Sequence, residues 1–147
     1  MATRSYIGIY NSDSNTVDYI YCHFDGFLDY VGRILVNYYT DAARVRQLIA
    51  LGGISSIGAD PTVQPKVSDK GYRDAIVTSN EQGVPLEVVA YHRDRGEELD
   101  TRTCTLPEYN EQDGMVSYTY LFKDGVWQVH RNGSFMPVEP LLRVDSE

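Results

Sequence analysis

Two stretches near the start of the chain alternate their side chains with the period of a β-strand. In 5–10, Ile7 and Ile9 fall on one face and tyrosines fall on the other. In 17–24, an apolar set alternates with a set of tyrosine and histidine. Period 2 with β-branched and aromatic residues favours strands, and the polar run NSDSN at 11–15 favours a turn. The two stretches therefore predict an antiparallel hairpin.

The spacing of apolar residues then changes to that of helices. Apolar residues recur three and four positions apart over 27–39, which predicts an amphipathic helix. A second helix should follow, with Thr40 or Asp41 as its N-cap and Gly52 placed to end it. Asp25 lies between the hairpin and this helix pair, and it is a possible N-cap of the first helix.

The middle of the chain carries weaker signals. Gly, Ser and Pro are frequent over about 53–72, which predicts a long loop. Two runs, 74–78 and 86–92, are strand candidates because they are rich in β-branched residues. The charged run 92–103 indicates a solvated loop or a sheet edge, and 106–115 indicates an irregular or weakly helical segment.

A second hairpin is predicted by the run SYTYLFKDGVWQVHR near the end of the chain. Its Asp-Gly pair is typical of a type I′ turn. That turn sets Phe122 opposite Trp127 and Tyr120 opposite Val129, on one face of the hairpin. Cross-strand aromatic pairs stabilise such a register by about 0.2–1 kcal/mol each.

Together these elements predict an α+β fold. We expect an antiparallel sheet with an N-terminal hairpin, a two-helix insertion packed on one sheet face and a C-terminal hairpin. The chain has 147 residues, which is close to the usual size of one domain. We therefore expect a single domain over 1–147, with the long loop at about 53–72 and an irregular C-terminal arm at 132–147.

Composition and charge narrow the classes of molecule that the chain could bind and the compartment in which it would act. The net charge is −8, and Lys and Arg are not clustered, so direct binding of duplex DNA is not expected. The acidic surface would instead face a basic partner protein or keep the chain in solution. We expect a location in the cytoplasm, because the start of the chain does not resemble a signal peptide and no run is apolar enough for a membrane helix. Both cysteines would then be reduced.

Cys22, His23 and Asp25 form the densest group of reactive side chains. Strand alternation sends Cys22 and His23 to opposite faces, so His23 is not placed to act as a base for the thiol. Cys22 falls on the apolar face, which favours a buried and inert thiol. His23 shares its face with Tyr19 and Tyr21, and we expect that face to be open to a ligand.

The run AYHRDRGEEL supplies the second candidate group. If the strand continues through it, Arg93 and Arg95 share one side, beside Tyr91 and His92. Arginine forks bind phosphates and carboxylates, so a ligand-binding role is one interpretation. The other is mutual salt bridging with the neighbouring acidic residues, of the kind common on protein surfaces.

Motifs for catalysis and metal binding are absent from the sequence. It has no phosphate-binding glycine loop, no HExxH and no nucleophile elbow, and its histidines and cysteines are scattered. We therefore predict no catalytic residues, no metal site and no cofactor, although a carboxylate-based, metal-dependent hydrolase stays open. The candidate ligand-binding residues are Tyr19, Tyr21, His23, Tyr91, His92, Arg93 and Arg95.

Four segments resemble a family of small proteins encoded by tailed phages and prophages. They are YIYCHFDGFLDYVGRIL, TDAARVRQLIALGGISSIG, AYHRDRGEEL and YTYLFKDGVWQV, within residues 3–131. The family pattern has YCHWDG, LGDLSSLG, YxRDRGE and YLFxxGxW. Here Phe24 stands where that pattern often has Trp, and Gly53 replaces an acidic residue. Residues 59–90 match no part of the pattern.

The resemblance implies a phage origin and a role against host defences, as in other accessory phage proteins of this size. The first hypothesis is a sponge, like those that counter Thoeris and CBASS, which would sequester a cyclic or ADP-ribose-type signalling nucleotide. Such sponges commonly bind at subunit interfaces, so a homo-oligomer is expected. The second is a direct inhibitor of a host defence protein, like an anti-CRISPR, which would mimic nucleic acid with its acidic surface. The third is the small hydrolase.

Overall fold

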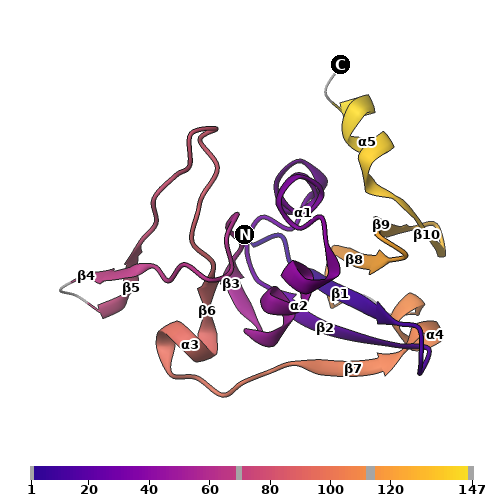
Figure 1. Cartoon of the computed structure of the whole chain (residues 1–147), viewed down its shortest axis with the longest axis horizontal. Coiled ribbons are helices and arrows are strands. Elements are labelled where there is room, and N and C mark those ends of the chain that lie inside the picture. The colour runs from indigo at the N-terminus through magenta and orange to yellow at the C-terminus, as the bar shows by residue number, and fades with distance from the viewer. Residues whose placement is uncertain (1, 69–70, 112–114, 146–147) are drawn as a thin grey trace.

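The computed structural model describes residues 2–68, 71–111 and 115–145 (Figure 1). An eight-stranded sheet has the order β10-β9-β8-β1-β2-β3-β6, and β7 also pairs with β2. Its strands are β1 (Ser5–Asn11), β2 (Thr16–Cys22), β3 (Ile54–Ser56), β6 (Val89–Ala90), β7 (Arg102–Thr105), β8 (Tyr118–Lys123), β9 (Val126–Arg131) and β10 (Ser134–Pro137). The predicted α+β class is confirmed.

Both predicted hairpins form. β1 pairs with β2 in antiparallel register, with Ile7 opposite Ile20. β8 pairs with β9, and Phe122 lies opposite Trp127 as the Asp-Gly turn predicts. These registers depend on local turn chemistry and on side-chain alternation, which the sequence displays directly.

The sheet is mixed rather than antiparallel throughout, which corrects the sequence prediction. β1 runs parallel to β8, and β2 runs parallel to β3. Each parallel pair joins strands that are separated by a long connection, and a long connection allows either direction. Side-chain alternation is the same in both directions, so the sequence pattern cannot distinguish them.

The two-helix insertion packs on one face of the sheet. A π-helical turn (Leu28–Gly32) leads into α1 (Arg33–Tyr38), and α2 (Ala42–Ala50) follows. Together with α5 (Val138–Asp145) they cover an apolar core, whose fully buried members include Ile7, Ile20, Leu35 and Leu48. This apolar face fixes the sheet in one register.

The helix ends show which capping predictions hold. Asp41 is the N-cap of α2, and its side chain accepts a hydrogen bond from the backbone N–H of Arg44 at 2.8 Å. Gly52 follows α2 with a positive φ of +76°, as a helix-ending glycine should. Asp25 is not an N-cap, since Phe27 occupies that position without a side-chain cap. Asp25 instead takes a left-handed conformation, with φ of 59°.

Three predicted irregular or extended segments fold differently. The expected loop at 53–72 contains β3 and β4 (Lys66–Ser68), and β4 pairs with β5 (Gly71–Ile76). The strand expected over 86–92 ends at Ala90, where α3 (Tyr91–Arg95) begins. The expected irregular arm at 132–147 contains β10 and α5. Strand pairing decides the outcome for β4, β5 and β10, whereas α3 is set by hydrogen bonds within its own segment.

A different segment, residues 60–88, leaves the main sheet between β3 and β6 and carries β4 and β5 (Figure 1). We call this segment the arm. Its base is held by backbone bonds from Ala59 N–H to Pro85 O at 2.8 Å and from Asp60 N–H to Leu86 O at 2.9 Å. Gly58 lies against this base, where a Cβ would stand 2.2 Å from the Glu87 carbonyl oxygen. The arm therefore has a closely packed base.

Candidate functional site

The second face of the sheet carries a cluster of tyrosines. Tyr6 and Tyr19 contact each other edge to face at 5.1 Å, and Tyr109 from α4 (Leu106–Asn110) lies 5.1 Å from Tyr19. The Tyr109 hydroxyl donates to the Tyr120 carbonyl at 2.6 Å. Tyr19 is therefore buried, with 8 % of its surface exposed. The expectation that its face is open to a ligand is wrong at this position.

A pocket opens where β3 and β7 separate along the same edge of β2. β7 pairs with Thr16 to Tyr19, and β3 pairs with Cys22, so Tyr21 lies between the two partners. The volume of this pocket is about 460 Å³. We call it the tyrosine pocket, and its lining residues are Tyr21, Gly53, Tyr91, Glu97, Glu98, Leu99 and Asp100.

The two tyrosines of the pocket are fixed by their neighbours. The Tyr21 hydroxyl and the His23 Nδ1 are hydrogen-bonded at 2.7 Å. Burial raises the pKa of Tyr21, while the nearby Arg4 charge opposes that rise. Burial likewise raises the pKa of Tyr91, against a hydrogen bond with the Ser55 side chain and the charge of Arg95. Both phenols are therefore neutral at physiological pH.

Carboxylates form the other wall of the tyrosine pocket. Asp100 receives two hydrogen bonds from Arg102, from Nε and from one terminal nitrogen, each at 3.1 Å. The Asp100 carbonyl also accepts from the N–H of Gly53 at 3.0 Å, which fixes this loop to the sheet. Glu97 and Glu98 make no ion pair with any residue that the structure describes. The pocket therefore has a negative rim.

The two arginines of the AYHRDRGEEL run do not form a ligand clamp. α3 is helical because the Asp94 carboxylate accepts from the N–H of Ala90 at 2.8 Å and Gly96 ends the turn. Arg93 points into the base of the arm, where it donates to the carbonyls of Pro61 at 2.8 Å and Val88 at 2.6 Å. It also pairs with Asp94 at 2.9 Å. The salt-bridge interpretation therefore holds for Arg93.

Arg95 and His92 lie outside the arm. The guanidinium of Arg95 stacks over the Tyr91 ring, 5.2 Å from its centroid, and its buried Nε has no hydrogen-bond partner among the described residues. His92 is exposed, with Nδ1 2.8 Å from the Glu97 carbonyl oxygen. The structure thus groups Tyr21, His23, Tyr91 and Arg95 at or beside the pocket, and leaves Tyr19 and Arg93 inside the fold.

Sequence reasoning missed the acidic rim. Glu97, Glu98 and Asp100 were predicted to be part of a solvated charged loop. A signal was present, because three acidic residues fall within four positions, separated from Arg95 by one glycine. Their approach to Tyr21 depends on the contact between Gly53 and Asp100, which sequence spacing does not reveal.

Cys22 behaves as predicted. It is fully buried beneath the helices, and burial raises its pKa from 9.0 to about 12. Its Sγ contacts the carbonyl oxygen of Phe24 at 3.5 Å. The thiol is therefore a core group.

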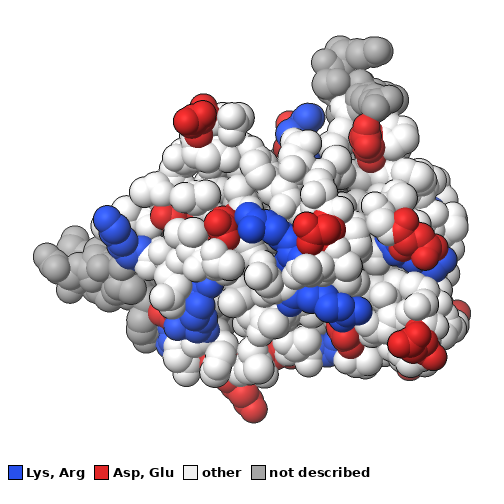
Figure 2. All heavy atoms as spheres, in the orientation of Figure 1, with Lys and Arg blue, Asp and Glu red and all other residues white. Residues whose placement is uncertain are grey.

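Surface charge is mixed on the face shown in Figure 2, where basic and acidic side chains lie next to one another. The ion pairs of the molecule include Arg44 with Asp60 at 3.8 Å and Arg46 with Asp18 at 3.5 Å. Across residues 2–68, 71–111 and 115–145, no group of three His, Cys, Asp or Glu side chains is arranged to hold a metal ion. In the same ranges, no helix has the length and apolar character needed to cross a membrane.

Comparisons with known proteins identify no relative of this chain. The phage resemblance, the cytoplasmic location and the homo-oligomer all stay predictions. No model of a protein family matches the chain, and no curated protein or solved structure matches it either.

Proposed function

We propose that this protein acts by binding a partner protein, and that the tyrosine pocket receives a basic side chain of that partner. The observation that carries this proposal is the combination of two neutral tyrosines with the carboxylates of Glu97 and Glu98 in one pocket, where Asp100 is already paired with Arg102. Aromatic faces attract cations, and carboxylates stabilise them further when solvent is partly excluded. None of the described residues that line the pocket is Lys or Arg.

The biological setting comes from the sequence resemblance. A tailed-phage accessory protein would use such a pocket to dock on a host defence protein and block it. The net charge of −8 favours a basic partner over a nucleic acid. Mimicry of nucleic acid has less support, because the charges are interspersed on the face in Figure 2 rather than gathered by sign.

Sequestration of a signalling nucleotide is the second candidate. Arg95 stacked on Tyr91 favours it, since an aromatic face can stack a base and a guanidinium can bind a phosphate. Glu97 and Glu98 would repel that phosphate at the same pocket, and Arg93 is already engaged within the fold. The rim therefore favours a cation. A metal-dependent hydrolase has less support, because no group of carboxylates within the described ranges is arranged to hold a metal ion.

Calorimetry with a matched pair of peptides tests the first proposal. One blocked tetrapeptide contains arginine, and its twin contains citrulline, which has nearly the same shape without the charge. We expect the arginine peptide to bind at least about tenfold more tightly, a difference of about 1.4 kcal/mol. Equal binding of the two peptides, or no heat from either, would overturn the proposal.

Variants assign the binding to the pocket. The double substitution Glu97→Gln and Glu98→Gln should remove most of the preference for arginine over citrulline. Glu111→Gln is the single-charge control, because this exposed residue ends α4 on the tyrosine face, away from the pocket lining. If it costs half as much binding free energy as the double substitution, each charge counts equally, binding depends only on net charge and the pocket is not the site.

A nucleotide panel run in the same way separates the second candidate. Cyclic dinucleotides, ADP-ribose and cyclic ADP-ribose would bind if nucleotide capture is the function, and Arg95→Ala would abolish that binding. The same variant should leave arginine-peptide affinity unchanged or slightly higher, since it removes a nearby positive charge. The two functions therefore give opposite responses to one substitution.

A further inference from the structure

A row of four aromatic rings runs from the interior of the sheet, through the tyrosine pocket, to the surface. The buried Tyr6 ring lies 6.4 Å from the ring of Tyr21, which lines the pocket. The His23 ring lies 5.9 Å from Tyr21, and the Phe24 ring lies 4.5 Å from His23. Phe24 ends the row with 44 % of its surface exposed. We call His23 and Phe24 the aromatic shelf, because they continue the pocket onto the surface.

Strand β3 fixes the backbone of the aromatic shelf. The N–H of His23 donates to the Ile54 carbonyl at 3.1 Å, and the N–H of Phe24 donates to the Ser55 carbonyl at 3.0 Å. The hydrogen bond between the Tyr21 hydroxyl and His23 also holds the imidazole in place. A ligand that covers the shelf therefore does not have to order this part of the backbone first, which lowers the entropic cost of binding.

Leu99 adds a second exposed apolar side chain to the site. It lines the tyrosine pocket with 50 % of its surface exposed, and it directly follows Glu97 and Glu98 in the chain. Removing apolar surface of this kind from water is favourable. The pocket and its shelf therefore offer apolar contacts beside the acidic rim.

Charge decides what covers these apolar side chains. Glu97 and Glu98 line the pocket that the aromatic shelf continues. A second copy of the chain would bring a net charge of −8 to the same carboxylates, so contact between two copies is disfavoured there. A basic segment of a partner protein is attracted instead. The group that covers Phe24 therefore belongs to the same segment as the basic side chain.

We propose that the aromatic shelf binds an aromatic side chain of the partner, two positions from the basic side chain that enters the tyrosine pocket. This inference rests on the proposed function, because the bound basic side chain places the segment over the shelf. In an extended segment, side chains two positions apart lie on the same side, about 6.6–6.8 Å apart. That spacing is similar to the 5.9 Å between the rings of Tyr21 and His23, so the two side chains can reach the pocket and the shelf together.

Four blocked pentapeptides test the two parts of this segment separately. Each has a central arginine or citrulline, flanked by glycines and ending in either phenylalanine or alanine at both ends. Because both ends carry the same residue, each peptide covers both directions in which the segment could lie. By calorimetry, we expect the arginine peptide with phenylalanine to bind at least about fivefold more tightly than the arginine peptide with alanine.

The outcomes distinguish this inference from the proposed function. If the arginine peptides bind more tightly than their citrulline twins but phenylalanine adds nothing, the shelf is not used and the proposed function stands. If the citrulline twins bind as tightly as the arginine peptides, the proposed function fails and this inference fails with it.

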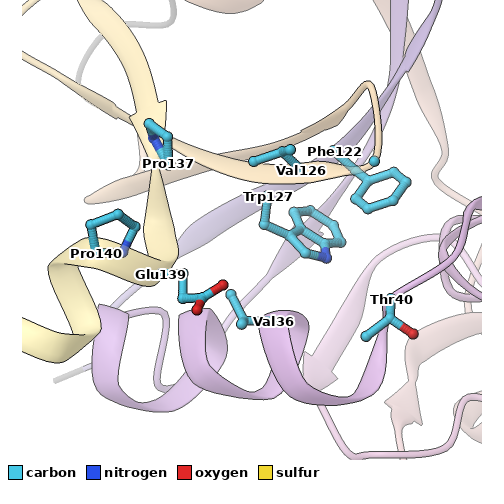
Figure 3. Close-up of a pocket in the computed structure, with 9 residues that line it drawn as sticks. Val36, Thr40, Phe122, Val126, Trp127, Pro137, Glu139 and Pro140 are labelled. Carbon is cyan, nitrogen blue, oxygen red and sulfur yellow. The ribbon is translucent and has the colours of Figure 1, made fainter.

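Phe24→Ser assigns the contribution of phenylalanine to the shelf. It should remove most of the gain from phenylalanine, while affinity for the alanine peptide changes by less than about twofold. Val126→Ser is the matched control, because Val126 is also 44 % exposed and lines a different pocket, beside Trp127 (Figure 3). The two positions lie at opposite ends of β1, near its Ser5 end and its Ile9 end respectively. Equal losses in the two variants would show non-specific apolar binding and overturn the proposal.

Amide resonances locate the bound peptide without any substitution. In a ¹⁵N–¹H spectrum, the Phe24 amide should shift with the phenylalanine peptide and much less with the alanine peptide, while the Gly53 amide of the tyrosine pocket shifts with both. An unshifted Phe24 amide at saturation would overturn the proposal. So would sedimentation that shows a dimer which Phe24→Ser dissociates, because a second copy would then cover the shelf.

Discussion

Gly8 shows how one residue decides the packing of the tyrosine face. It lies in β1 beneath Tyr109, with no side chain between them. A Cβ at this position would stand 2.6 Å from Cγ1 of Val17 and 2.9 Å from the Tyr109 hydroxyl. That hydroxyl is itself held by the Tyr120 carbonyl. The closeness of α4 to the sheet therefore depends on the missing side chain.

We predict that Gly8→Ala lowers the free energy of unfolding by about 1–3 kcal/mol, because Tyr109 or Val17 must move to make room. Urea denaturation measures the change. Gly32→Ala is the control, since a Cβ there meets its nearest atoms at 3.4 Å and alanine favours a helix. An equal or larger loss at Gly32 would show that space above β1 is not the cause.

Cys22 gives a prediction in two parts, reactivity and pH. Because burial raises its pKa to about 12, an aromatic disulfide reagent should label Cys104 in the folded chain and Cys22 only after unfolding. A folded-state pKa above the unfolded one stabilises the fold below the unfolded pKa of 9.0, and that contribution is lost as pH rises toward 12.

Between about pH 8 and pH 10 the wild-type chain should therefore lose about 1.4 kcal/mol more stability than Cys22→Ala does, as measured by urea denaturation at each pH. The comparison cancels the buried tyrosines, which titrate identically in both proteins. Rapid labelling of both thiols in the folded wild-type chain would contradict a buried Cys22. Equal losses of stability in the wild-type chain and in Cys22→Ala would contradict it as well.

At the scale of elements, the arm depends on Arg93. This guanidinium bonds carbonyls on both sides of the arm's base, at Pro61 and Val88, and its Nε pairs with Asp94. Only the planar fork of arginine can reach these acceptors together. The arm is therefore fixed to the main sheet by a residue that the sequence suggested as a ligand clamp.

We predict that Arg93→Lys lowers the free energy of unfolding by about 2–3 kcal/mol, since at least one charge-assisted hydrogen bond is lost while the charge remains. Thermal unfolding measures it, and Arg95→Lys is the matched control. Arginine-peptide affinity, measured where both variants are folded, should be unchanged by Arg93→Lys. If Arg93→Lys leaves stability unchanged but weakens peptide binding, Arg93 belongs to the binding site instead.

The elements also show what a sequence can predict. The two hairpins follow from alternation and turn residues, and α2 follows from Asp41 and Gly52, because these signals are local. The helical turn α3 depends on Asp94 reaching back to Ala90, and β10 exists because β9 offers it an edge. At the tyrosine pocket, the sequence predicts tyrosine and arginine as candidate residue types. It does not predict that Tyr21 and Tyr91 line the pocket while Tyr19 and Arg93 lie inside the fold.

At the scale of the whole molecule, the net charge of −8 acts on folding and on binding with opposite signs. Self-repulsion among excess carboxylates opposes the compact state, and salt screens that repulsion. Salt also screens the attraction between the tyrosine pocket and a basic peptide. The salt concentration therefore separates a general effect of charge on stability from a specific effect of charge on binding at the tyrosine pocket.

We predict that raising sodium chloride from about 20 mM to about 300 mM increases resistance to urea while arginine-peptide affinity falls about three- to tenfold. Binding of the citrulline twin should not change, because it brings no charge to the rim. Calorimetry and denaturation on the same preparations measure both trends. If peptide affinity is insensitive to salt, the carboxylates of the rim do not face the bound cation. If stability and affinity fall together, ion pairs within the fold outweigh its net repulsion, and the weaker binding then reflects loss of the folded pocket.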